Sequence, residues 1–291
     1  MRKKFADIFF KGVIITAAVS VSALLVLMLI HIIRESIPAF STLGAEMFQA
    51  DTKWQPVSGT PQFGLLPAIT GTLYVSAIAV ILALIFGVGG ALFLNYYLPD
   101  NIAKIFLSFI ELVAGIPSVI FGFIGLTVVV KGFAKIGKMA AGQCVLAAGI
   151  VLGVMLLPYV IATCSESVQN ARKTYELSAL ALGLSKEAVL LKTILPSIRR
   201  GIIAAAMMAF GRGLGETMAV MMVIGNSPIF PKFFGRGQTI PALTALEMGS
   251  IEYGSMHLSV LYAANAVLLI LLFVVLGCGH MLRRRLDKDE T

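Results

Sequence analysis

The stretch ELSALALGLSKEAVLLKTILP, residues 176–196, decides the fold because it separates two long apolar runs with a polar segment of its own periodicity. Apolar residues recur at helical spacing on both sides of Gly183 and Ser185. We therefore predict two short helices that meet at a glycine-containing turn. Such a projection can seat an apolar face in a groove on another protein. The alternative is an amphipathic helix that lies along a membrane surface.

The composition around this stretch is that of an integral membrane protein. Of 291 residues, 58% are hydrophobic and 13% are charged, and the mean hydropathy is +0.92. This apolar content is too high for an ordinary soluble domain. The net charge of +8 arises from basic residues at the ends of apolar runs, where such residues set membrane orientation. We therefore expect membrane lipid as a partner and exclude nucleic acid.

Six runs are long enough to cross about 30 Å of hydrocarbon as helices. They cover residues 12–33, 69–97, 105–130, 143–165, 201–226 and 258–282. We predict an all-α integral membrane fold with six transmembrane helices. The chain is expected to form a single transmembrane domain over residues 1–291, with residues 69–285 as its core bundle.

An even number of crossings places both termini on one side, and the positive-inside rule identifies that side. Most of the 23 Lys and Arg residues lie near the two termini or in the 166–200 loop. We predict that these three segments are cytoplasmic in a multi-pass protein of the cytoplasmic (inner) membrane. The loops at 35–64 and 227–257 are then exported, where they can cap a pathway or contact an extracytoplasmic partner.

The fifth run carries an ionisable pair. Arg212 and Glu216 are four residues apart, which places them on one face of the predicted helix. Charges at this depth face a bundle interior or a cavity, and a pair that only secures packing is the alternative. An arginine fork fits a tetrahedral oxyanion, and a glutamate accepts a proton from hydrogen phosphate, which sulfate lacks at neutral pH. The surrounding glycines allow close approach of a backbone or a ligand: Gly211, Gly213 and Gly215.

The third run contains a second candidate site. Glu111 precedes Gly115 and Pro117 within it. Pro117 removes a helix hydrogen bond, so we predict a kink that acts either as a gate or as a static bend. Glu111 is a further candidate for substrate binding, either paired with Arg212 across the bundle or held in a structural hydrogen bond.

The sequence lacks the motifs of an ATPase or a hydrolase. Residues 132–139 fit the spacing GxxxxGK, but Met139 stands where a P-loop needs Ser or Thr to hold magnesium. We predict that the chain is not an enzyme and carries no metal or cofactor of its own.

The 176–196 stretch resembles the coupling loop of ABC-importer permeases. The positions that match or lie next to the family pattern are Glu176, Ser178, Ala179, Gly183, Leu195 and Pro196. Leu177 stands where the family has its glutamate, and Glu176 lies one residue earlier. The resemblance implies that this loop docks on a separate ATPase.

Three further segments resemble the PstC-type permease of phosphate ABC importers. They are FGLLPAITGTLYVS (63–76), ELVAGIPSVIFGFIGL (111–126) and GRGLGETMAVMMVIGN (211–226). The resemblance implies a type I importer permease fold and transport of inorganic phosphate. It also implies a homologous second permease, an ATPase dimer that binds ATP and magnesium, and an extracytoplasmic phosphate-binding protein.

Alternative functions remain open from the sequence. One is a permease for another oxyanion, such as sulfate or molybdate. Another is a secondary transporter driven by an ion gradient, in which Glu111, Arg212 and Glu216 form a proton relay. A third is a membrane scaffold, for which the intramembrane charges have no evident use.

Overall fold

A computed structural model describes residues 2–136 and 141–288 of the chain. Within that part, five helices are long and apolar enough to cross a membrane, and there are six if the bent pair Lys186–Ser197 and Arg199–Leu214 forms one span. The predicted helical membrane fold is confirmed. The first half contains α1 (Arg2–Thr42), a 3-10 turn (Gly44–Phe48), β1 (Trp54–Gln55), β2 (Gln62–Phe63), α2 (Leu66–Tyr96), α3 (Asp100–Ala114), α4 (Ser118–Ile124), a π-helical segment (Gly125–Val130) and α5 (Lys131–Ile136).

The second half begins with α6, the helix at the centre of the bundle. In chain order it contains α6 (Val145–Ala171), a π-helical segment (Arg172–Glu176), α7 (Leu177–Ala181), α8 (Lys186–Val189), a second π-helical segment (Leu190–Ile194), α9 (Leu195–Ser197), α10 (Arg199–Leu214), α11 (Met218–Ile224), α12 (Ile240–Glu247) and α13 (Met256–Lys288). The end of the rejected GxxxxGK match, Gly137 to Met139, lies outside the described residues.

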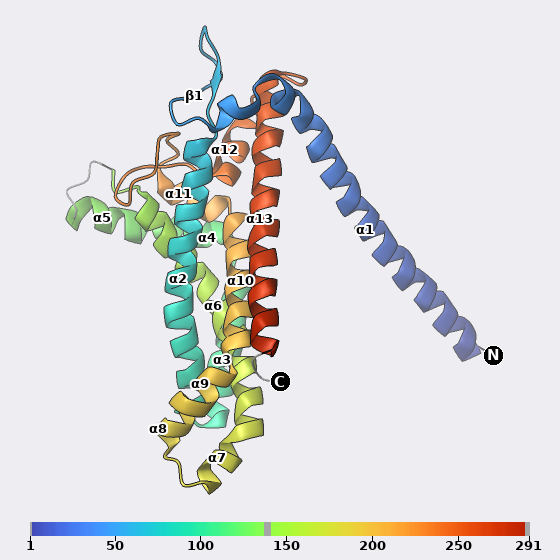
Figure 1. Ribbon diagram of the computed structural model, residues 1–291, viewed down its shortest axis with the longest axis vertical. Coiled ribbons are helices and arrows are strands. Elements are labelled where there is room, and N and C mark those ends of the chain that lie inside the picture. The colour runs from blue at the N-terminus through green and yellow to red at the C-terminus, as the bar shows by residue number, and fades with distance from the viewer. Residues whose placement is uncertain (1, 137–140, 289–291) are drawn as a thin grey trace.

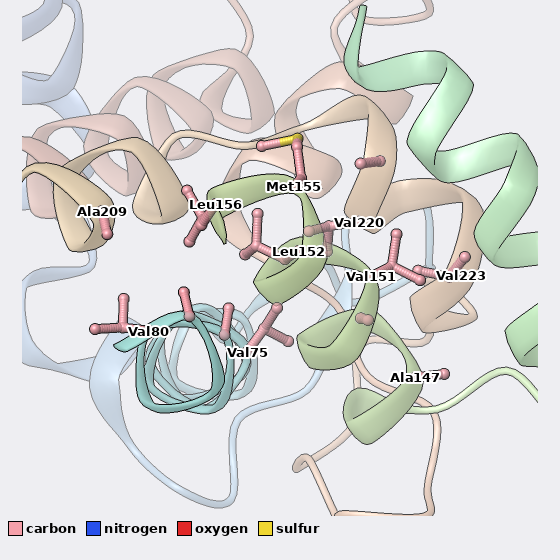
Figure 2. Close-up of a cluster of buried hydrophobic side chains, with 14 of the residues drawn as sticks. Val75, Val80, Ala147, Val151, Leu152, Met155, Leu156, Ala209, Val220 and Val223 are labelled. Atoms are coloured by element: carbon pink, nitrogen blue, oxygen red, sulfur yellow. The ribbon is translucent and has the colours of Figure 1, made fainter. Parts of the chain in front are cut away.

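The bundle is organised around the contact between α2 and α6. Figure 1 shows α2, α6, α10 and α13 running along one another, with α10 packed against the other three. Figure 2 shows side chains of α2 and α6 facing one another, among them Val75, Leu152 and Leu156, which are at most 1% exposed. Small residues permit this close approach. A Cβ atom at Gly149 would lie 2.5 Å from the Ile78 side chain.

Helix α1 diverges from this bundle. It contacts α13, with His31 Nε2 lying 3.3 Å from the Tyr262 hydroxyl, and its N-terminal half then runs away from the other helices (Figure 1). The most apolar window of its membrane span, Phe10–Thr42, is 0% buried within the chain. A helix this apolar is stable only against lipid or another subunit.

The two ends of the bundle differ in structure. At one end lie α7, α8 and α9, near the C-terminal end of α13 (Figure 1). At the other end lie α12 and the antiparallel β1–β2 hairpin, in which Trp54 pairs with Phe63. Trp54 Nε1 donates a 2.7 Å hydrogen bond to Glu247 Oε1, and Glu247 Oε2 lies 2.5 Å from His257 Nε2. This cluster joins the hairpin to α12 and α13, so the predicted 35–64 and 227–257 loops meet in one cap. Residues 35–42 of the first predicted loop belong to α1, which is longer than the predicted first span.

Two predicted spans are interrupted. The third, at 105–130, breaks between Ala114 and Ser118, where the proline kink is predicted, because Pro117 has no N–H to continue the helix. The fifth, at 201–226, breaks between Leu214 and Met218. That second break is not predicted by the apolar pattern.

Candidate functional site

The break between α10 and α11 corrects one prediction about the ionisable pair. Arg212 is in the last turn of α10, whereas Glu216 lies beyond its end, so the two are not on one face of a continuous helix. The Glu216 Oε1 atom accepts a 3.2 Å hydrogen bond from the Ala219 N–H at the start of α11. Gly213 and Gly215 weaken the helix, and a carboxylate that satisfies a free N–H of the next helix favours the interruption.

Arg212 is held by an aromatic ring of α6. Its guanidinium carbon lies 4.2 Å from the centroid of the Tyr159 ring, which is a cation–π contact. The Tyr159 hydroxyl donates a 2.8 Å hydrogen bond to the Ala114 carbonyl, at the end of α3. Tyr159 thus connects the two helix breaks, one following Ala114 and the other following Leu214.

The helices beyond the two breaks also pack together. A Cβ atom at Gly122 of α4 would lie 3.0 Å from the Ala219 Cα of α11. Both irregular backbone segments therefore belong to one assembled region. Non-helical backbone at membrane depth occurs where it is buried in protein or lines a cavity.

The remaining predicted site residues lie around this region in different ways. Glu111 is exposed on α3, one turn before its end, and within the described residues it makes no ion pair with Arg212. Pro117 is exposed and forms the N-terminal cap of α4. A Cβ atom at Gly211 would lie 3.3 Å from Leu272 of α13, whereas Gly213 has only ordinary contacts of 3.7 Å or more. Of the three glycines, Gly211 is therefore the one at which a neighbouring helix, α13, approaches closely, and Gly215 is the C-cap residue of α10.

The 166–200 loop has two helical segments that meet at a glycine-containing turn, as predicted, but the first is not a separate short helix. Helix α6 continues through the π-helical segment Arg172–Glu176 into α7, as one helical span from Val145 to Ala181. Helix α7 ends at Ala181, Gly183 follows with φ +81°, and α8 begins after Ser185. The positive φ requires a residue without a Cβ penalty, which explains the glycine. The Ser185 hydroxyl caps α8 by accepting a 3.3 Å hydrogen bond from the Ala188 N–H.

The two faces of this loop differ in burial. Ala179, Val189 and Ile194 are at most 6% exposed in a small core with the end of α6. Leu177 and Leu182 are 81% and 82% exposed, so they form an apolar surface at the end of the bundle. Ser178 and Gly183 are exposed as well, whereas Leu195 and Pro196 are half-buried.

A cluster of side chains fixes this loop to α2, and it is not predicted from the sequence. We call this cluster the α2 clamp; its residues are Asn95, Tyr96, Gln169, Arg172 and Glu176. Arg172 donates to the Asn95 carbonyl, forms a 2.9 Å ion pair with Glu176 and lies 5.5 Å from the centroid of the Tyr96 ring. Gln169 Nε2 donates to Asn95 Oδ1 at 3.0 Å.

The clamp also reaches α8. The Tyr96 hydroxyl donates a 2.9 Å hydrogen bond to the Lys186 carbonyl. The sequence signal that could have indicated the clamp is Asn95, a polar residue at the end of an apolar helix. Its side chain is only 4% exposed, and a buried amide needs hydrogen-bond partners. Glu176, which is predicted to belong to the ATPase-docking loop, pairs with Arg172 within the chain.

The fold agrees with comparisons to known proteins. The chain belongs to the family described as "Binding-protein-dependent transport system inner membrane component", which matches residues 83–288. It is thus the membrane-spanning permease subunit of an ABC importer. Such subunits are non-catalytic and work with an ATPase and a binding protein.

Individual relatives extend the match over nearly the full length. The chain is 31% identical to the phosphate transport system permease protein PstC of Mesorhizobium japonicum, covering 98% of this chain and 93% of the relative. It is 32% identical to the probable PstC of Methanocaldococcus jannaschii, covering 95% and 94%. It is 33% identical to the probable ABC transporter permease YqgH of Bacillus subtilis, covering 78% and 74%.

A solved structure supports the fold. An inward-facing form of the MetNI methionine ABC transporter superposes with a TM-score of 0.60 at 17% identity, covering 76% of this chain and 95% of that one. At this identity the likeness concerns the fold alone.

Proposed function

We propose that this chain forms half of the translocation pathway of an ATP-driven importer of inorganic phosphate. The observation that carries the proposal is the pair of helix breaks joined by Tyr159, with Arg212 held at their junction. Relatives of similar length that bear the name of phosphate permeases support the choice of substrate.

The chemistry at the junction fits hydrogen phosphate. The Arg212 side chain is exposed in the single chain and makes no ion pair within the described residues, so its donors are available to an oxyanion. The Glu216 Oε2 atom makes no hydrogen bond in the described part of the chain and can accept a hydrogen bond from the P–OH group of hydrogen phosphate. An anion without that proton would meet Glu216 as an unpaired negative charge, which disfavours sulfate. Glu111 adds a second carboxylate near the break.

The membrane orientation and the partner subunits are proposed from the family. The termini and the 166–200 loop face the cytoplasm, and the exposed Leu177 and Leu182 seat in a groove of an ATPase dimer that binds ATP and magnesium. A homologous second permease covers the exposed side of Arg212, because a cation at this depth needs a bundle interior. An extracytoplasmic phosphate-binding protein docks on the cap formed by the 35–64 and 227–257 loops.

The first prediction concerns Arg212. In proteoliposomes that contain the whole complex, we expect Arg212→Ala to lower ATP-dependent phosphate uptake by about 100-fold, because two charge-assisted hydrogen bonds contribute about 1.5–3 kcal/mol each. Arg212→Lys keeps the charge but loses the fork, so we expect an intermediate rate. Lys131→Ala, an exposed cation outside the junction, is the matched control and should transport normally.

Three outcomes contradict the proposal. Normal uptake by Arg212→Ala removes the role of this residue. Uptake of radiolabelled sulfate or molybdate in preference to phosphate makes the chain a permease for another oxyanion. Uptake that survives ATP depletion and stops when the proton gradient is collapsed identifies a secondary transporter.

A further inference from the structure

A polar pocket, which is open at the surface of the single chain and which we call the chamber, lies between α6, α10 and α13, towards the end of the bundle that carries the 166–200 loop. Its volume is about 510 Å³, and its lining includes Thr163, Glu166 and Asn170 of α6, Arg200 of α10 and Arg283 of α13. Figure 1 shows the end of α13 close to α9 and the start of α10. Polar groups from three membrane helices therefore converge at one place, which the proposed phosphate junction does not include.

The α6 residues of this chamber continue a stripe that starts at the junction. Tyr159, Thr163, Glu166 and Asn170 are spaced by four, three and four residues, which places them on one face of α6. Tyr159 is the ring that contacts Arg212, and the other three line the chamber. One face of α6 thus connects the Arg212 junction with the chamber.

Helix α10 also connects the two places. Arg200 lies in its first turn and Arg212 in its last, and at about 100° per residue the two side chains are rotated by about 120° from one another. Arg200 and Ala204 line the chamber, and Arg212 lies at the junction. Twelve residues of helix separate the two arginines, or about 18 Å along the axis at 1.5 Å per residue. Each of the two places therefore takes one arginine from α10 and polar side chains from one face of α6.

The chamber has the chemistry of the junction. It combines arginine donors with an amide and a hydroxyl, and it includes one carboxylate, Glu166. Arginine and amide groups donate to phosphate oxygens, and Glu166 can accept a hydrogen bond from the P–OH group of hydrogen phosphate. A Cβ atom at Gly201 would lie 2.0 Å from Ser167 Oγ, so the glycine lets α10 approach α6 at the chamber wall.

We propose that this chamber holds a phosphate group as a second station on the half of the route nearest the 166–200 loop. The proposal rests on the proposed phosphate transport past Arg212. Two sources supply the same chemistry at this depth, namely inorganic phosphate that leaves the transporter and the headgroup of a phospholipid. The arginines at the helix ends can bind either one.

The test measures protection of a thiol inside the chamber. Asn170→Cys is introduced into the complete complex together with Cys278→Ser, because Cys278 is exposed whereas Cys144 and Cys164 are buried. Alkylation by N-ethylmaleimide is timed without ATP in lipid-free maltoside micelles, with inorganic phosphate or with chloride at equal ionic strength. We expect phosphate to slow alkylation by about tenfold at a concentration roughly ten times its dissociation constant. Arg283→Gln should weaken this protection, and Val57→Cys, on the distant hairpin, should show none.

A second arm identifies the source of the phosphate group. The same thiol is alkylated in nanodiscs of phospholipid and of uncharged glycolipid, without added phosphate. Protection by free phosphate in micelles supports transported phosphate as the occupant. Protection only in phospholipid discs supports a lipid headgroup. Equal alkylation rates in all of these conditions, with Arg283→Gln unchanged, overturn the chamber as a phosphate-group site.

Uptake by the unmodified complex separates this proposal from the proposed function. If the complex imports phosphate and the chamber thiol is never protected, only the second station fails. If the complex does not import phosphate, the proposed function fails whatever the alkylation rates are.

Discussion

At the scale of single residues, Arg212 and Tyr159 determine what the junction can do. A cation–π contact contributes about 0.5–2 kcal/mol, whereas placing an arginine at the centre of a membrane helix costs about 2.5–3.5 kcal/mol on insertion scales. The ring of Tyr159 therefore orients Arg212 without fully offsetting the cost of placing its charge in the membrane. The remaining cost is relieved by an anion, by water or by a second subunit, as expected of a transient binding site.

The second prediction separates the two contacts of Tyr159. Tyr159→Phe keeps the ring below Arg212 and loses only the hydrogen bond to Ala114, which costs about 1 kcal/mol. Tyr159→Leu loses both contacts. We expect phosphate uptake to fall slightly in the first variant and strongly in the second, with Tyr253→Leu, an 85% exposed aromatic residue, as the control. Equal uptake by the Leu variant and the parent would show that the ring does not orient Arg212.

At the scale of elements, the sequence predicts local features better than contacts between distant segments. Gly183 and Ser185 indicate the two helices of the loop, and Pro117 indicates the break after α3, because each acts on its own backbone. The break after α10 is missed because the glycines around Arg212 also fit a packing face on a continuous helix. The α2 clamp is missed because Asn95 and Arg172 meet across 77 positions of the chain, which no local pattern encodes.

The third prediction concerns the α2 clamp. Arg172→Met removes the bonds to Asn95 and Glu176 and the contact with Tyr96, so the connection between α2 and the 166–200 loop is weakened although the Gln169–Asn95 and Tyr96–Lys186 bonds remain. We expect ATP hydrolysis to continue while phosphate imported per ATP falls by about tenfold or more, since one charge-assisted bond contributes about 1.5–3 kcal/mol.

The control for the clamp is the neighbouring cation. Lys173 is exposed and makes no hydrogen bond or ion pair in the part of the chain that the structure describes. Lys173→Met should therefore leave the ratio of transport to hydrolysis unchanged. A normal ratio in Arg172→Met, with the complex intact, would show that coupling does not pass through the clamp.

At the scale of the whole molecule, the single chain has the surfaces of a subunit. Helix α1 has an unburied membrane span, Arg212 is open on one side, and Leu177 and Leu182 project from the end of the bundle. Composition and span pattern predicted the membrane class, and the resemblance predicted the family that the comparisons confirm. The placement of α1 could not be predicted, because lipid and partner subunits both stabilise an apolar helix.

The central claim is that the 166–200 loop projects into the cytoplasm, where a separate ATPase drives it. The most direct test labels Leu182→Cys and Val57→Cys, which replace side chains 82% and 93% exposed at opposite ends of the molecule, in a Cys278→Ser background. With a membrane-impermeant maleimide and intact cells, we expect position 57 to be labelled at once and position 182 only after permeabilisation. Labelling of position 182 from outside, with position 57 protected, would invert the topology and contradict the account.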